Sequence, residues 1–318
     1  MQIHHGIDGL KSLPRGAVLS IGNFDGIHRG HRRILELAKQ LRGPAGAALV
    51  TFEPHPMTVL RPELAPPRLS PFPLKQIMLE AIGIDHLVVI PPTPEVLNLS
   101  AEAFWKLLCD DVQPTHLIEG ESFRFGKGRG GSIDRLREWT KDSQIELMVV
   151  EPVKVPLLNL QVAPISSSLV RWLLMNGRAR DAAICLGHPF VLRGQVIKGF
   201  QRGRTIGVPT ANLDCGDQLI PAEGVYVGRS TIDGTTHAAA ISIGTMPTFG
   251  ENQPQVEVHL IDFNGDLYGQ TLDVEILDWL RDQWKFSGVD ALKRKMDQDI
   301  QWARIRSTID ASKPIAVN

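Results

Sequence analysis

The chain has 318 residues, 43% of them hydrophobic and 22% charged, which is ordinary for a globular protein and long enough for two domains with separate cores. Its 34 basic and 35 acidic residues leave a formal net charge of −1. This balance argues against broad non-specific binding to nucleic acid or to anionic membranes, which needs an excess of positive charge, although local basic clusters can still bind a small phosphorylated ligand.

The N-terminal segment, MQIHHGIDGLKSLP, lacks the long apolar core of a signal peptide, and no apolar run reaches membrane-spanning length. Three widely spaced cysteines, Cys109, Cys185 and Cys215, are typical of buried thiols in a reducing compartment rather than of a disulfide framework or a metal site. The sequence therefore predicts a cytoplasmic protein.

Residues 17 to 152 alternate short apolar runs with helical patterns. The apolar runs are typical of strands buried on both faces of a sheet: AVLSIG, AALVTFEP, HLVVI, HLIEG and IELMVVEP. Helices are predicted between them, first where Ile34, Leu37, Ala38 and Leu41 form an apolar stripe, then in LKQIMLEAIG and in AEAFWKLLCDDV, which follows the candidate N-cap Ser100. Two further helices, in SSSLVRWLLMNG and ARDAAICLG, close this half. Alternating strands and helices predict βαβ units and a doubly wound parallel sheet.

From about residue 186 the pattern changes to successive strands separated by turns. The strand candidates are FVLRGQVIKG, GVYVGRSTI, THAAAISIG, QVEVHLID and TLDVEILDWL, with turns such as IDGTT and FNGDLYG between them. This pattern predicts a small antiparallel β-barrel. A terminal helix, VDALKRKMDQDIQWARIR, is expected to pack on it through Leu292, Met296 and Ile300. We therefore expect an α/β domain over residues 1–186 and a β-barrel domain over residues 187–318.

The first candidate site is the stretch GNFDGIHRGH, in which Gly22 and Gly26 bracket a turn after a predicted strand. His28 and His31 then share a face at the start of a helix. A helix N-terminus favours phosphate through its unpaired N–H groups and its dipole, and the carboxyl end of a parallel strand is where ligands bind in open α/β sheets. The alternative is that His28 only caps the helix and His31 packs on the sheet. Zinc fits less well, because no third ligand lies at a suggestive spacing.

The second candidate site is GFQRGRTIGVPTAN, where Gly199, Gly203 and Gly207 surround Arg202 and Arg204. Glycines let backbone N–H groups approach phosphate closely, and the arginines add positive charge. The stretch lacks the Gly-Lys-Ser/Thr ending of a Walker motif, and a basic hairpin turn is the alternative. The PTAN ending favours a phosphate site, because the hydroxyl of Thr210 and the amide oxygen of Asn212 are hard ligands suited to Mg²⁺.

Six motifs follow one another along nearly the whole chain: GNFDGIHRGH, TFEPHP, GESFRFGKGRGG, ISSSLVR, GRTIGVPTAN and VEVHLIDFNGDLYG. In this order they resemble the bacterial bifunctional riboflavin kinase/FAD synthetase family. The resemblance places His28 and His31 in the HxGH signature of nucleotidyltransferases. It implies that the protein phosphorylates riboflavin to FMN and then transfers an adenylyl group from ATP to FMN, giving FAD and pyrophosphate. Riboflavin, FMN, FAD, ATP and ADP are the implied ligands, with Mg²⁺ accompanying ATP.

The resemblance also implies residue roles in the N-terminal half. Asn23, His28 and His31 would hold the triphosphate of ATP, while Arg171 would supply a fixed cation that donates two hydrogen bonds to phosphate. The full set implied to bind ATP in both halves is Gly22, Asn23, His28, His31, Ser166, Ser167, Arg171, Gly199, Arg202, Gly203, Arg204 and Thr210. Without the family, Ser166 reads as an N-cap and Arg171 as a surface residue.

Flavin contacts are implied at His55, Ser122, Phe123 and Arg281. Lys127 and Arg129 would lie on a basic glycine-rich loop near the same substrate, or simply on a solvated surface loop. Ser122 departs from the family, which usually has Asp or Asn there, so whatever that side chain orients would be held less firmly.

In the C-terminal half, Glu257 matches the family's catalytic glutamate. Alternation along the predicted strand would turn Val256 and Val258 to the core and Glu257 into a cleft, where it could accept the proton of the ribityl hydroxyl. A solvent-facing carboxylate is the alternative. Gln283 and Trp284 depart from the family's frequent LRDEQKF, in a segment that borders the flavin.

Three functions compete on the sequence. The first is the bifunctional enzyme, with catalytic residues Glu257, His28, His31 and Arg171 and with Thr210 and Asn212 as metal ligands. The second is a riboflavin kinase whose adenylyltransferase half is impaired or altered at Ser122. The third is a flavin- or nucleotide-binding regulator without turnover. The sequence predicts no nucleic-acid or membrane partner and leaves open a weak homo-oligomer.

Overall fold

The structure is a computed structural model that describes residues 1–199, 207–246 and 251–308. By its internal packing the chain divides into two compact units. The first comprises Met1–Pro66 and Phe72–Val153, and the second comprises Pro67–Pro71 and Lys154–Asn318.

The first unit is built on a parallel sheet of six strands in the order β1-β4-β3-β2-β5-β8. Its strands are β1 (Gln2–His5), β2 (Val18–Ile21), β3 (Ala47–Phe52), β4 (His86–Ile90), β5 (His116–Gly120) and β8 (Glu146–Val150). The central strands β2, β3 and β4 are almost wholly buried, as their continuous apolar runs predict. The polar sequence of β1 gave no strand signal, yet it pairs with β4 at the sheet edge.

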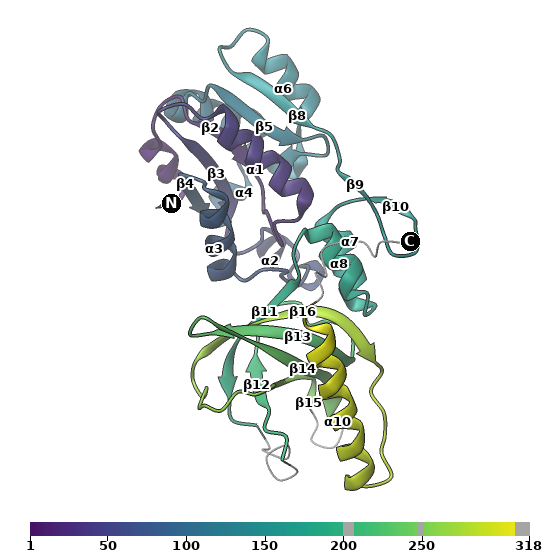
Figure 1. Ribbon diagram of the computed structural model, residues 1–318. Helices are drawn as coiled ribbons and strands as arrows, with labels where there is room; N and C mark the ends of the chain where they lie inside the picture. The colour runs from purple at the N-terminus through teal and green to yellow at the C-terminus, as the bar shows by residue number, and fades with distance from the viewer. Residues whose placement is uncertain (200–206, 247–250, 309–318) are drawn as a thin grey trace. The chain divides into compact units, whose positions relative to one another are not determined.

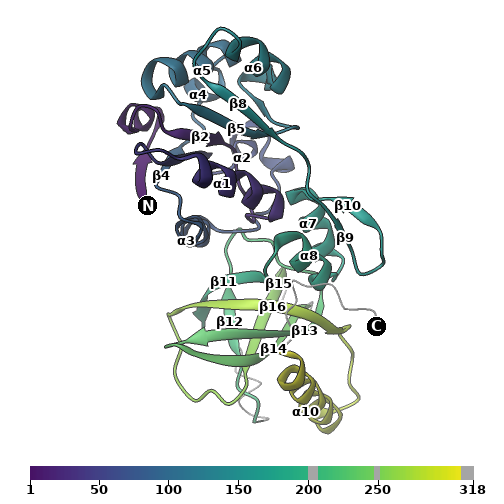
Figure 2. The same ribbon diagram turned by 45° about the horizontal axis from the view of Figure 1, so that its top comes forward.

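Helices cover both faces of this sheet (Figures 1 and 2). One face packs on α1 (Arg29–Leu41) and α3 (Phe72–Ile82), and the other packs on η1 (Ile7–Ser12), α5 (Ala101–Leu107) with the π-helical turn η3 (Leu108–Val112), and α6 (Ile133–Thr140). The strands alternate between the two apolar clusters: Val18 lies in the first and Leu19 in the second. The predicted doubly wound arrangement is confirmed.

Short elements complete the first unit. They are α2 (Met57–Leu60), η2 (Pro62–Leu64), α4 (Pro94–Leu97), β6 (Arg124–Phe125), η4 (Lys127–Arg129) and β7 (Gly131–Ser132). The predicted cap of α5 is present, since Ser100 Oγ accepts the N–H of Ala103 at 3.1 Å. All three cysteines are free thiols; Cys185 and Cys215 are buried, and Cys109 is half-buried.

The second unit contains a closed barrel in the order β11-β12-β15-β14-β13-β16, with every neighbouring pair antiparallel. The strands are β11 (Phe190–Ile197), β12 (Ala211–Asp214), β13 (Gly224–Ile232), β14 (Thr235–Met246), β15 (Glu251–Leu260) and β16 (Thr271–Arg281). Asp233 and Gly234, both at positive φ, form the tight turn between β13 and β14, as the IDGTT motif predicts.

The terminal helix α10 (Val289–Arg306) spans the predicted residues and lies along the barrel beside β13 and β14 (Figure 1). Ile300 and the buried Ala303 pack on barrel residues, while Leu292 and Met296 are half-buried.

The remaining elements of this unit are β9 (Lys154–Pro156), β10 (Val162–Pro164), α7 (Ser167–Met175) and α8 (Ala179–Leu186). Ala183 of α8 lies in one apolar cluster with Val227 and Leu277 of the barrel. By packing, α7 and α8 therefore belong with the barrel, whereas the sequence pattern grouped them with the first half. The division of activities at residue 186 stays a prediction.

Candidate active sites

His28 and His31 lie at the N-terminus of α1, directly after the turn that follows β2. His28 is the N-cap, and its Nδ1 accepts the backbone N–H of His31 at 3.2 Å. The two rings stack with their centroids 3.6 Å apart, and His31 also contacts the ring of Phe24. Burial, together with the neighbouring His28 and Lys75, holds the pKa of His31 well below its usual value of 6.5, so this ring is neutral at pH 7. The capping role of His28 is confirmed, and the assignment of the two histidines to a phosphate site stays a prediction.

Asn23 is held from several sides at the same edge of the sheet. Its side-chain amide faces His55 Nε2 at 3.0 Å, and its backbone carbonyl accepts hydrogen bonds from Lys75 Nζ at 3.0 Å and Thr51 Oγ1 at 3.3 Å. His55 Nδ1 in turn accepts the N–H of Met57 at 3.1 Å. The structure thus brings the predicted residues Asn23 and His55 together, from the loops after β2 and β3.

Lys75 is a component of this cluster that sequence reasoning missed. It is 4% exposed, and its Nζ lies 3.5 Å from the Glu53 carboxylate and within hydrogen-bond distance of the Asn23 carbonyl. The sequence did contain a sign of this role: Lys75 stands four residues before Leu79 and therefore shares the apolar face of the predicted helix. Lys75 therefore fixes the Asn23 carbonyl in the β2–α1 turn, with Glu53 as its counter-charge.

The loop after β5 carries the other predicted flavin contacts of the first unit. Ser122 is exposed in a turn closed by the Phe123 N–H and the Gly120 carbonyl at 2.9 Å. The Phe123 ring stacks on Phe125 with centroids 5.3 Å apart and packs against the apolar cluster, so this residue has a structural role in addition to any contact with flavin. Lys127 and Arg129 lie exposed in η4.

Ser166, Ser167 and Arg171 lie on α7, which belongs to the second compact unit, whereas His28 belongs to the first. Ser166 is the N-cap of α7, and its Oγ accepts the N–H of Leu169 at 3.1 Å. Arg171 Nε donates to the carbonyl of Pro67 at 2.8 Å, within the same unit. The capping interpretation of Ser166 is confirmed, and the assignment of these residues to ATP stays a prediction.

In the barrel, Asn212 of β12 pairs in register with Glu257 of β15, and Glu257 pairs on its other side with Ser242 of β14. Directly opposed residues on neighbouring strands have Cβ atoms about 5 Å apart, so these three polar side chains form one row. Val256 and Val258 are buried and Glu257 is half-buried, so the predicted alternation is confirmed.

Gly199 closes one end of this row. A Cβ atom at Gly199 would lie 2.3 Å from Asn212 Nδ2, so only glycine fits beside that amide as it stands. Three other predicted ATP contacts, Arg202, Gly203 and Arg204, lie outside the described residues.

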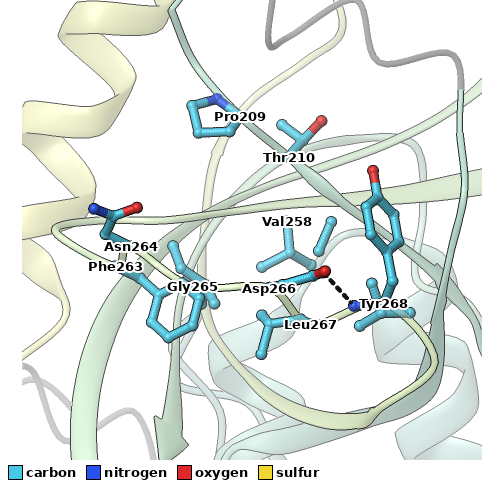
Figure 3. Close-up of a pocket in the computed structure, with 12 residues that line it drawn as sticks. Pro209, Thr210, Val258, Phe263, Asn264, Gly265, Asp266, Leu267 and Tyr268 are labelled. Carbon is cyan, nitrogen blue, oxygen red and sulfur yellow. Dashed lines mark hydrogen bonds between the residues drawn. The ribbon is translucent and has the colours of Figure 1, made fainter.

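A cavity of about 550 Å³ opens beside Thr210 (Figure 3). It is lined by Val196, Pro209, Thr210, Ala211, Val258, Leu260, Phe263, Asn264, Gly265, Asp266, Leu267 and Tyr268. The hydroxyl groups of Thr210 and Tyr268 lie on the same side of it, and Asp266 accepts the N–H of Tyr268 at 3.0 Å. Ala211 of β12 and Val258 of β15 face this cavity. Their neighbours along the strands, Asn212 and Glu257, point to the opposite face, because side chains alternate along a strand. His259, which the sequence analysis missed, fixes this corner through a hydrogen bond with the Pro209 carbonyl at 2.8 Å.

Arg281, a predicted flavin contact, forms an ion pair with Asp299 of α10. Its Nη2 and Nε lie 2.6 and 2.9 Å from Asp299 Oδ2, and both side chains are nearly buried. The guanidinium also lies 5.3 Å from the ring centre of Trp284, which Lys295 approaches at 5.0 Å. Arg281 therefore ties β16 to the terminal helix, and its contact with flavin stays a prediction.

The first unit presents a histidine-capped helix at the carboxyl edge of a parallel sheet, and the barrel presents a carboxylate and an amide in register near a cavity. Such an arrangement is compatible with an enzyme of phosphorus-group transfer. Family models agree with this class. A model described as FAD synthetase matches residues 10–168, and one described as riboflavin kinase matches residues 186–306.

Relatives extend the similarity over the whole chain. A bifunctional riboflavin kinase/FMN adenylyltransferase from Pseudomonas fluorescens is 34% identical and covers 96% of this chain and 97% of its own; the protein of the same name from Listeria monocytogenes is 32% identical over 95% and 96%. A solved structure described as a macrolide-efflux protein from Streptococcus pneumoniae is 29% identical, with a TM-score of 0.83 over 96% of this chain and 99% of its own.

The chain therefore belongs to the bifunctional riboflavin kinase/FMN adenylyltransferase family. It is an enzyme that phosphorylates riboflavin to FMN and converts FMN to FAD, with ATP as the co-substrate. Within the described residues, no helix is both long and apolar enough to cross a membrane.

Proposed function

We propose that residues 1–186 carry the FMN adenylyltransferase activity and residues 187–318 the riboflavin kinase activity, each with the site residues that the sequence motifs indicate. The positions of the two family-model matches support this division. The observation that carries the kinase assignment is the register of β12 and β15, which sets Asn212 directly opposite Glu257.

In the kinase, Glu257 accepts the proton of the ribityl 5′-hydroxyl as that oxygen attacks the γ-phosphorus of ATP. An alcohol needs such a base, because its proton is lost only as the new bond forms. Thr210 lines the cavity and stands two residues before Asn212, so ATP would bind with its phosphates near Thr210, and its nucleoside would extend into the cavity. The apolar lining suits a base, and Asp266 and Tyr268 offer polar contacts at the rim.

The donor set suits Mg²⁺ carried with ATP. The described residues hold no group of three or more His, Cys, Asp or Glu side chains that could bind a metal by themselves. The hydroxyl of Thr210 and the amide oxygen of Asn212 are hard neutral ligands, and Mg²⁺ commonly binds through few protein oxygens together with substrate phosphates. The metal would neutralise charge on the phosphates, while Glu257 remains the proton acceptor.

In the adenylyltransferase, a phosphate oxygen of FMN attacks the α-phosphorus of ATP and pyrophosphate leaves. The nucleophile is already ionised, so the protein's task is alignment and neutralisation of charge. Asn23, His28 and His31 would hold the triphosphate at the N-terminus of α1. His55 and the loop carrying Ser122 and Phe123 would line the FMN side.

A pair of substitutions tests the division of labour. In Glu257→Gln, FMN formation from riboflavin should fall by about 10²- to 10⁴-fold, the usual contribution of a general base, while adenylyl transfer to supplied FMN is unchanged. In His28→Asn, which keeps a good N-cap but removes the imidazole, FAD formation should fall and FMN formation should remain.

Both reactions are followed by chromatographic separation of flavins over time, with riboflavin, ATP and Mg²⁺ supplied. Glu275→Gln is a matched control, because this barrel carboxylate pairs with Arg229 outside the proposed site. Loss of both activities in either variant would refute the assignment. FMN accumulating without FAD in the unaltered protein would instead indicate that Ser122 has impaired the first unit.

The substrates also suggest where the protein works. ATP and riboflavin are small cytoplasmic metabolites, so we place the enzyme in the cytoplasm, without a nucleic-acid or membrane partner. Any weak homo-oligomer would appear as a concentration-dependent mass in analytical ultracentrifugation.

A further inference from the structure

Glu119 is a buried acid that the mechanism above does not use. It lies one residue before the end of β5 and is 2% exposed. Alternation along β5 puts it on the same face as Leu117, which belongs to the apolar cluster beneath α5 and α6. A carboxyl group in such a place, within an otherwise apolar strand, needs a specific partner.

The partner is the backbone of β2. Glu119 Oε1 accepts the N–H of Ile21 at 2.7 Å. Leu19 of β2 lies opposite Leu117 of β5 in the sheet. Two residues further along each strand, the Glu119 carboxyl accepts the hydrogen bond of the Ile21 N–H. On the other side of β2, the Gly22 N–H donates to the Val50 carbonyl of β3 at 2.9 Å. The side chain of Glu119 is therefore inserted between β2 and β5 where the two strands end.

This gap is the topological switch point of the sheet. The strand order runs from β2 through β3 and β4 to one edge, and from β5 to β8 at the other edge. In open α/β sheets, ligands bind in the crevice at the carboxyl ends of the two strands where the order reverses. Glu119 lies at the base of that crevice.

The hydrogen bond also joins the two loops that flank the crevice. Ile21 is followed directly by Gly22 and Asn23, and Glu119 is followed by Gly120, whose carbonyl closes the turn that carries Ser122. We propose that Glu119 is a positioning residue for adenylyl transfer, whose carboxyl oxygen sets the spacing between the β2–α1 turn and the loop after β5. The inference rests on the proposed assignment of ATP binding to the β2–α1 turn.

The chemistry of the carboxyl suits this role. Burial raises the pKa of Glu119 well above its usual range, and the Ile21 N–H offsets this only in part. The raised pKa favours the uncharged carboxyl, which presents a carbonyl oxygen to the N–H and adds no negative charge near the triphosphate, where an anion would repel the substrate.

Three substitutions at this position test the proposal in the full-length protein. Glu119→Gln keeps a neutral acceptor at the same reach, Glu119→Asp withdraws the carboxyl by one methylene, and Glu119→Leu removes the acceptor while filling the space. Each variant is assayed for kcat and KM(ATP) of FMN adenylylation and, in the same sample, for riboflavin phosphorylation. The kinase reaction reports the amount of intact second unit, and urea unfolding followed by circular dichroism reports whether the first unit, which carries Glu119, is folded.

We expect Glu119→Gln to stay within about threefold of the unaltered enzyme. Glu119→Asp and Glu119→Leu should lose about 10- to 100-fold in kcat/KM(ATP) with a raised KM(ATP), since a misplacement of about 1 Å can cost that much. A raised KM(ATP) cannot arise from a smaller folded fraction, so it separates positioning from stability.

Unchanged KM(ATP) and kcat in the Asp and Leu variants would overturn the proposal. So would a Gln variant as impaired as the Leu variant, because the proton and not the acceptor would then matter. If the first unit of the Leu variant fails to fold, as loss of its unfolding transition would show, the contrast between Gln and Asp decides. Failure of the proposed ATP assignment itself appears separately, as normal FAD formation in His28→Asn.

Discussion

Substituting alanine for Gly199 is the sharpest test of the kinase site, because the structure fixes what the added methyl group meets. The new Cβ would lie 2.3 Å from Asn212 Nδ2, 2.4 Å from its Cγ and 2.6 Å from its Oδ1. Ordinary van der Waals contact begins at 3.4 Å, so the Asn212 amide must move by about 1 Å.

Gly199→Ala should lower the rate of riboflavin phosphorylation and leave the free energy of unfolding almost unchanged. The contacted atoms are the end of a half-buried side chain that can turn aside, and alanine in place of glycine also restricts the unfolded chain, which stabilises by about 0.4–1 kcal/mol where the backbone is compatible. A proposed metal ligand displaced by about 1 Å can nevertheless cost about 10²-fold in rate. Gly199→Ala should therefore unfold at nearly the same urea concentration and phosphorylate riboflavin about 10²-fold more slowly.

The assay measures FMN formation at saturating riboflavin with ATP and Mg²⁺ varied, and FAD formation from supplied FMN in the same sample. The second rate should not change. Gly288→Ala is the matched control, since a Cβ there meets no atom within 4 Å and the φ of 176° suits any residue. Kinase activity in Gly199→Ala equal to that of the control would refute the reasoning, because Asn212 could then move without consequence.

Two further predictions concern stability. Asp299→Ala should destabilise the barrel unit by about 3–5 kcal/mol, because it leaves the nearly buried Arg281 guanidinium without its carboxylate; urea unfolding measures this, and a change below 1 kcal/mol would contradict it. His31 has a folded-state pKa below the 6.5 of the unfolded chain, so the unfolded state binds the extra proton first. The free energy of unfolding of the first unit should be highest above pH 6.5 and decline as the pH falls toward the folded-state pKa, and His31→Gln should flatten this slope; equal slopes in both proteins would contradict it.

Elements that depend on local pattern could be predicted from the sequence. The longer strands of both units are predicted by their apolar runs, and α10 by its periodic pattern. The short strands β6, β7, β9, β10 and β12 were not predicted, because runs of two to four residues carry too little pattern. Strand β1 was not predicted either, since its polar sequence becomes a strand only because β4 offers an open edge. The grouping of α7 and α8 with the barrel was equally out of reach, because it depends on which apolar surface those helices meet.

The candidate site residues also fall into those that a sequence motif indicates and those that only tertiary contacts reveal. Residues within a contiguous motif, such as His28 and Glu257, could be named and placed on the right elements, whereas Asn212 was named without the strand β12 that carries it. Lys75 and Glu119 are single charges within apolar runs, and only tertiary contacts with Asn23 and Ile21 reveal what they hold. A buried charge on an apolar face was nevertheless a signal, because such a residue is stable only with a partner.

Gln283 shows how a departure from the family pattern can be understood from its contacts. Its Nε2 donates to Ser242 Oγ at 2.9 Å and to the Ile243 carbonyl at 3.0 Å. The family's more frequent glutamate, when ionised, has no proton to donate, and its oxygens would face that carbonyl with like partial charge. Ser242 is the cross-strand neighbour of Glu257. The exchange is therefore not conservative in this chain: the amide fastens the segment after β16 to β14 beside the proposed base, by contacts that a carboxylate cannot make.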